Sequence, residues 1–108
     1  MRLYGRAAVS LVDHLLAGRF MEATLRFDRG LAKNTSLALL ERTWTDLIER
    51  FGEPIARGDP LPTRASLRRL CITVRCQRGE FDVLVDCAPY LGRIYGVDFW
   101  PPSEALKS

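Results

Sequence analysis

The sequence holds few of the residues from which metal sites and disulfide frameworks are built, and it lacks the long apolar runs of membrane spans. Its three cysteines are an odd number and its histidine is single, so neither a disulfide framework nor a zinc site is indicated. No apolar run approaches the ~20 residues that span a bilayer, and Asp13 and His14 interrupt the first apolar segment, which does not suit a secretory signal. We expect a soluble, cytoplasmic protein with no membrane partner, no metal and no cofactor.

Concentrated positive charge is also missing. The net charge of +3 comes from 16 basic and 13 acidic residues that are interspersed along the chain. Arg64, Arg68 and Arg69 form the densest basic cluster, but no aromatic residue is interleaved with them to stack on bases. A solvated basic edge is the favoured interpretation, and no nucleic-acid partner is expected.

The length and composition are those of one small globular domain. A chain of 108 residues buries roughly 65% of the surface that its unfolded form exposes, which is enough for one core. Hydrophobic content of 47% with 27% charged residues is ordinary for such a domain. We assign the domain to 1–102, with a turn at 89–92 and a flexible tail at 103–108.

Apolar residues recur every three or four positions in the first half of the chain and predict three helices, at 4–17, 20–27 and 37–51. Gly18 is expected to end the first helix and Gly52 the third, since glycine readily adopts the left-handed conformation found after many helices. The periodicity is clearest in the third helix, whose apolar positions are Leu37, Leu40, Trp44, Leu47, Ile48 and Phe51.

The period changes to two in the second half and predicts two strands on either side of Arg78-Gly79. Placing Gln77 opposite Glu80 sets Arg75 opposite Asp82, a favourable pair on the wetter face. The same register puts all the apolar residues of both strands on the other face: Leu70, Ile72, Val74, Cys76, Phe81, Val83, Val85 and Cys87.

A final strand at 93–100 and a short edge strand at 55–57 complete the sheet. Tyr95, Val97 and Phe99 share the face of the final strand that we assign to the core. The fold class is therefore α+β, with three N-terminal helices packed on one face of an antiparallel sheet of about four strands.

Apolar and glycine positions in several stretches form one further pattern: 9–20, the Phe27-Asp28 pair, Leu40 with Trp44 and Leu47, Phe51-Gly52, and 94–99. The pattern resembles an uncharacterised family of the nuclear transport factor-like (cystatin-like) superfamily, whose domains occur alone or ahead of α/β-hydrolase domains. The resemblance covers nearly the whole chain and implies a cone-shaped fold with a pocket between the helices and a curved sheet. It also implies a homodimer formed through the sheet, whose outer face carries Leu84 and Cys71.

The wider superfamily includes ketosteroid isomerases, dehydratases, epoxide hydrolases and polyketide cyclases, which use an Asp or a His beside Tyr or Trp. The resemblance and our face assignments make Asp28, His14 and Tyr95 the candidate catalytic residues. A desolvated Asp28 would move a proton, while His14 or Tyr95 would donate a hydrogen bond to an oxyanion. The candidate ligand-binding residues are Trp44, Glu41, Phe27 and Phe99.

Each of these assignments has a structural alternative. Asp28 precedes a glycine-containing segment and would equally form a turn or cap. Glu41 would equally extend to solvent, and the large aromatic residues would equally fill the cone. Two functions remain. The first is a small-molecule-binding protein, possible as a cofactor-independent isomerase, dehydratase or cyclase that acts on an apolar metabolite. The second is a non-catalytic accessory or dimerisation module.

The three thiols are expected to be structural. Cys76 and Cys87 fall on the predicted core face, and we expect none of the three thiols to be a low-pKa nucleophile. We expect Asp86 to neighbour Cys71 and to raise the pKa of its thiol.

Overall fold

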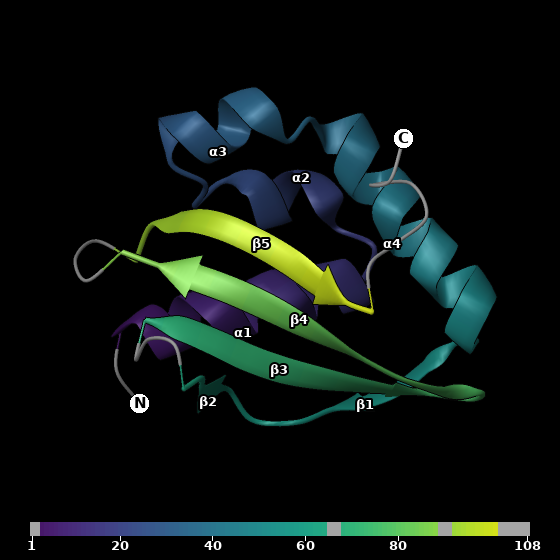
Figure 1. Cartoon of the computed structure of the whole chain (residues 1–108). Coiled ribbons are helices and arrows are strands. Elements are labelled where there is room, and N and C mark those ends of the chain that lie inside the picture. Colours follow the sequence, from purple (N-terminus) through teal and green to yellow (C-terminus); the bar gives the residue numbers. More distant parts are fainter. Residues whose placement is uncertain (1–2, 65–67, 89–91, 102–108) are drawn as a thin grey trace.

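The computed structural model describes residues 3–64, 68–88 and 92–101, which form an α+β domain of four helices and five strands. The helices come first and occupy the N-terminal half of the chain (Figure 1). Their bounds are α1 (Leu3–Leu16), α2 (Phe20–Thr24), α3 (Arg29–Asn34) and α4 (Leu37–Phe51).

One antiparallel sheet contains all five strands. Its order is β1-β3-β4-β5, and β2 pairs with β3 beside β1. Helix α1 crosses behind the sheet in Figure 1, and none of the helices of the described residues lies over the face turned toward the viewer. The strand bounds are β1 (Pro54–Arg57), β2 (Leu61–Pro62), β3 (Arg69–Cys76), β4 (Gly79–Cys87) and β5 (Ile94–Trp100).

Helix α4 confirms the clearest periodicity of the sequence. Its N-cap is Ser36, whose side chain accepts a hydrogen bond from the Leu39 N–H at 3.0 Å. Gly52 ends the helix at φ +89°, where an L side chain would be strained, and its N–H donates to the Ile48 carbonyl. Gly18 likewise follows α1, at φ +74°.

The prediction of one helix over 20–27 is wrong, because a contact with the last strand interrupts it. Helix α2 ends at Thr24, and Phe27 forms a parallel bridge with Ile94. The Asp28 N–H donates to the Ile94 carbonyl and the Ile94 N–H to the Arg26 carbonyl, both at 2.8 Å. A short additional helix, α3, then begins, so the described chain has four helices where three were predicted.

The β3–β4 register differs by two residues from the predicted one. Cys76 lies opposite Gly79, so Arg75 faces Glu80 and not Asp82. The cause lies outside the hairpin. The Gln77 N–H donates to the Glu53 carbonyl at 3.1 Å, and the Arg78 N–H donates to the Phe51 carbonyl at 2.7 Å. These bonds dock the loop on the end of α4.

A shift of two residues leaves every side chain on its predicted face. The eight apolar residues assigned to the core side of β3 and β4 are all buried, as predicted: Leu70, Ile72, Val74, Cys76, Phe81, Val83, Val85 and Cys87.

Strand β5 contains a bulge that reverses the predicted facing of its first residues. Asp86 pairs with Gly96 and the next residue, Cys87, pairs with Ile94, so β5 has one extra residue at this point. Ile94 is consequently fully buried, whereas Tyr95 is 45% exposed. The assignment of Tyr95 to the core side is therefore wrong, while Phe99, beyond the bulge, is buried as predicted.

No helix within the described ranges is long and apolar enough to cross a membrane. The predicted turn at 89–92 falls mainly on residues outside these ranges, as do the predicted tail at 103–108 and the end of the domain at 102.

The core packing predicts a large effect of truncating Leu47, which is fully buried on α4. We expect Leu47→Ala to lower the free energy of unfolding by about 2–5 kcal/mol, because it removes buried methyl groups and leaves a cavity. Ile55→Ala is the control, since Ile55 is 63% exposed and its truncation should change stability by less than about 0.5 kcal/mol. Urea unfolding of both variants measures the difference, and equal losses would contradict the assigned core.

Candidate functional site

Aromatic rings fill the space between helices and sheet where a pocket was predicted. The rings of Trp44 and Phe81 meet edge to face with centroids 5.5 Å apart, and Phe99 lies 6.5 Å from each. Phe51 extends the cluster at 5.7 Å from Phe81. Trp44 and Phe99 are each only 6% exposed, so both of these predicted ligand-binding residues belong to the core.

Trp44 also borders a surface hollow of about 520 Å³ between the end of α4 and the β3–β4 loop. The polar groups of this hollow already bond to one another. Arg78 donates to the Glu49 carbonyl at 2.6 Å, and the Gln77 side chain accepts from the Glu53 N–H at 3.4 Å. Such mutual pairing makes this hollow a weaker candidate for binding a polar ligand.

Asp28 acts as the N-cap of α3. Its side chain accepts a hydrogen bond from the Leu31 N–H at 2.7 Å, with extended backbone at φ −72° and ψ 172°. The structural alternative offered for this residue, a cap or turn, thus describes its observed contact.

The other predicted site residues are dispersed. Tyr95 and Glu41 are exposed, on β5 and α4 respectively, and Phe27 is buried at 5% exposure against the core. The segment 26–28, the start of β5 and helix α1 do converge, but of the three candidate catalytic side chains only His14 lines a cleft there.

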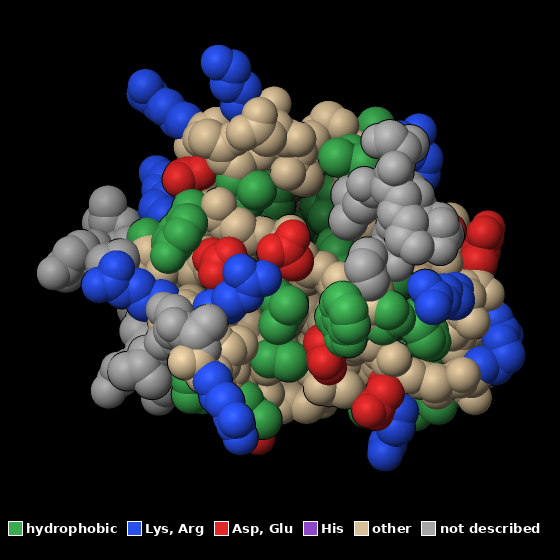
Figure 2. Space-filling model, viewed as in Figure 1, with side chains coloured by type: hydrophobic (Ala, Val, Ile, Leu, Met, Phe, Trp, Pro, Cys, Tyr) green, Lys and Arg blue, Asp and Glu red, His purple; other side chains and the backbone are tan. Residues whose placement is uncertain are grey.

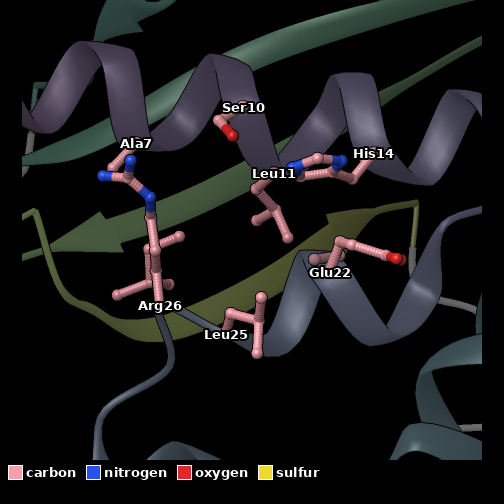
Figure 3. Close-up of a pocket in the computed structure, with 9 residues that line it drawn as sticks. Ala7, Ser10, Leu11, His14, Glu22, Leu25 and Arg26 are labelled. Carbon is pink, nitrogen blue, oxygen red and sulfur yellow. The ribbon is translucent and has the colours of Figure 1, made fainter.

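That cleft lies between α1 and α2 and has a volume of about 230 Å³ (Figure 3). Ser10, Leu11 and His14 project into it from α1, facing Leu25 and Arg26, which follow α2. Its complete lining is Ala7, Ser10, Leu11, His14, Glu22, Ala23, Leu25, Arg26 and Ile94.

The polar groups of the cleft are incompletely paired. The Nδ1 atom of His14 is buried, and the described residues offer it no hydrogen-bond partner. Leaving such a group unpaired typically costs about 1–3 kcal/mol, which a well-filled core would not need to bear. Arg26 is exposed, and its guanidinium makes no ion pair within the described part of the chain.

Sequence reasoning included His14 among the candidate catalytic residues but missed Ser10 and Arg26. The spacing of Ser10 and His14 was a usable signal, because residues four apart share one face of a helix. Arg26 could not be found this way, because the predicted helix over 20–27 gave it a helical position that the bridge to Ile94 removes.

Burial raises the pKa of all three thiols. Burial, followed by the charge of Asp86, raises the pKa of Cys87 to about 11. Burial, followed by the charge of Glu53, raises the pKa of Cys76. For Cys71, burial is the largest cause and Asp82 the next, through its charge and a hydrogen bond. The expected neighbour of Cys71 was Asp86; the register shift puts Asp86 opposite Arg69 instead.

No cluster of His, Cys, Asp and Glu that could hold a metal ion is present in the described ranges. No protein-family model, curated protein or solved structure matches the chain. The resemblance to nuclear transport factor-like proteins therefore stays a prediction beside the observed α+β fold.

The capping role of Asp28 predicts that Asp28→Ala lowers the free energy of unfolding by about 0.5–2 kcal/mol. Asp28→Asn should stay within about 0.5 kcal/mol of the wild type, because Asn is an equally good N-cap. Thermal unfolding measures both, with Glu41→Ala on an exposed helix position as the control. Unchanged stability of Asp28→Ala would overturn the cap and favour the catalytic assignment.

The thiol environments predict selective alkylation. Native protein treated with iodoacetamide at pH 8 should leave Cys87 unmodified and label Cys71 slowly, as measured by mass spectrometry. Because the carboxylate of Asp82 raises the pKa of Cys71, Asp82→Asn should lower that pKa and speed labelling by roughly twofold or more. Asp86→Asn is the matched control, and an equal acceleration there would contradict the observed register.

Proposed function

We propose that this chain is an association module that pairs with a second copy of itself through the outer face of its sheet. The observation that carries the proposal is a partly exposed apolar strip on a sheet face that no helix of the described residues covers, combined with a core already filled by its own aromatic rings. The strip consists of Leu61, Cys71, Leu84 and Trp100.

The strand register brings the residues of this strip next to one another. Leu61 pairs with Cys71 and Cys71 with Leu84, across three neighbouring strands. Trp100 pairs with Asp82, two residues before Leu84, and is therefore the diagonal neighbour of Leu84 on β5, while Asp98 lies directly opposite Leu84. Directly opposed side chains lie about 4.5–5.5 Å apart and diagonal ones about 7–8 Å, so Trp100 adjoins the other three residues across a pair of carboxylates.

Exposure and charge both favour pairing of identical faces. Leu61 and Trp100 are each 64% exposed, at the two ends of the strip. Beside it, Arg69 bridges Asp86 at 3.4 Å and Asp98 at 2.8 Å, so both charge signs border the apolar band. Figure 2 shows hydrophobic side chains on this face with acidic and basic ones directly beside them.

The available area is sufficient for a specific contact. Strands β3, β4 and β5 contain eight, nine and seven residues, and β1 and β2 add four and two at the edge beside β3. At about 3.3 Å per residue and about 4.8 Å between strands, the face covers roughly 480 Å² per copy. Two such faces bring about 1,000 Å² together, which is the lower bound for a stable interface. A two-fold axis between the sheets would place each strip on its copy.

The cleft beside His14 favours a second candidate function, the binding of a small molecule. The specific chemistry expected from the sequence, acid/base isomerisation, dehydration or cyclisation of an apolar metabolite, needs a carboxylate facing the bound molecule. The Asp28 carboxylate is instead engaged by the Leu31 N–H, so the geometry favours binding over that chemistry.

Pairing through the strip predicts a dimer in light scattering at high micromolar concentration. We expect Trp100→Glu to raise the dimer dissociation constant by at least about thirtyfold, because a charge replaces an aromatic residue at the interface. Leu61→Glu should act in the same direction.

Ile55→Glu and Met21→Glu are the controls, because both residues are 63% exposed and lie outside the strip. Their dimers should dissociate as the wild type does. A wild-type monomer at high micromolar concentration, or equal weakening by control and strip variants, would refute the proposal.

A further inference from the structure

The cleft between α1 and α2 combines an arginine that makes no ion pair with the described residues, an imidazole, a hydroxyl and an apolar wall in a small volume. From this combination we propose that the cleft binds a small monocarboxylate with an apolar body. The inference rests on the second candidate function, small-molecule binding, and is independent of pairing through the sheet.

The polar groups approach the cleft from opposite sides. His14 and Ser10 lie on one face of α1, and the Arg26 side chain rises from the other wall toward Ala7 (Figure 3). Because the Nδ1 atom of His14 is buried, Nε2 is the ring nitrogen left to face the cleft. A carboxylate between these walls would accept hydrogen bonds from Arg26, from Nε2–H of His14 and from the Ser10 hydroxyl.

The charge pattern selects an anion with one negative charge. The planar guanidinium of Arg26 matches the two oxygens of a carboxylate. Among the described residues of the lining, Arg26 is the single Lys or Arg, so it can pair with one negative charge, whereas the second charge of a phosphate dianion would have no cation to pair with there. The Glu22 carboxylate points away from Arg26 in Figure 3 and leaves the guanidinium open to a ligand.

The remaining lining sets the body of the ligand. Leu25 supplies the most exposed apolar surface, and the almost fully buried Leu11, Ile94, Ala7 and Ala23 form an apolar floor beneath it. A volume of about 230 Å³ equals roughly eight water molecules and lies below the ~300 Å³ of drug-sized sites. An aromatic or short aliphatic acid of roughly eight to ten non-hydrogen atoms fits, with an expected Kd of about 0.1–1 mM.

Benzoate is the probe, titrated into isotope-labelled wild-type protein and followed by amide chemical shifts. We expect saturable shifts centred on Ser10, His14 and Arg26, and at least about tenfold weaker binding of benzyl alcohol, which has the same ring without the charge. Saturable shifts elsewhere, or no saturable shifts at 10 mM benzoate, would overturn the proposal.

Two variants test the assigned groups against a matched control. Arg26→Gln keeps most of the side-chain stem and should weaken benzoate binding at least about tenfold, whereas Arg29→Gln, an exposed arginine outside the lining, should not weaken it. His14→Phe should weaken binding roughly threefold or more without lowering the melting temperature, because Nδ1 has no partner to lose in the described chain.

The outcomes separate the proposed ligand from the broader function. If benzoate and benzyl alcohol bind equally well and Arg26→Gln does not weaken either, the small-molecule-binding function stands and the proposal that the ligand is a carboxylate is refuted. Binding unchanged in His14→Phe, or equally weakened by Arg26→Gln and Arg29→Gln, would overturn the assigned contacts.

Discussion

The bridge between the segment 26–28 and Ile94 is the constraint on which the rest of the structure depends. Two backbone hydrogen bonds of 2.8 Å join residues that lie more than sixty positions apart. They end the helical path after Thr24 and place Asp28 where it caps α3. On β5, the other side of the bridge, Ile94 is buried beside a bulge and Tyr95 is exposed. The cleft beside His14 exists because this bridge holds Arg26 and Ile94 against α1.

The sequence correctly predicted the buried faces of those elements in which one regular spacing of apolar residues decides which side chains are buried. Leu40, Trp44 and Leu47 repeat along α4, and the alternating residues of β3 and β4 face the core whether the hairpin register is the predicted or the observed one. A two-residue shift cannot reverse a face, which is why the core assignment survived the wrong register.

The errors arose where a distant segment decided the local geometry. The hairpin register follows from bonds between its loop and the carbonyls of Phe51 and Glu53, and no pattern within the hairpin encodes them. Tyr95 was misassigned because a bulge adds one residue to β5, and alternation alone carries no sign of it. The candidate site depended on both β5 and the segment after α2, so its side chains are dispersed in the structure.

The size of the chain explains why its open cleft lies at the edge and its centre is filled. By the cavity cost measured in another protein, about 24 cal/mol per Å³, an empty core cavity of the cleft's 230 Å³ would cost roughly 5 kcal/mol. That is a large share of the ~5–15 kcal/mol by which small domains are stable. The rings of Trp44, Phe81 and Phe99 remove that cost by occupying the centre. A cleft between two helices at the surface is filled by solvent and costs less, so in a domain of 108 residues a ligand site is cheapest outside the core.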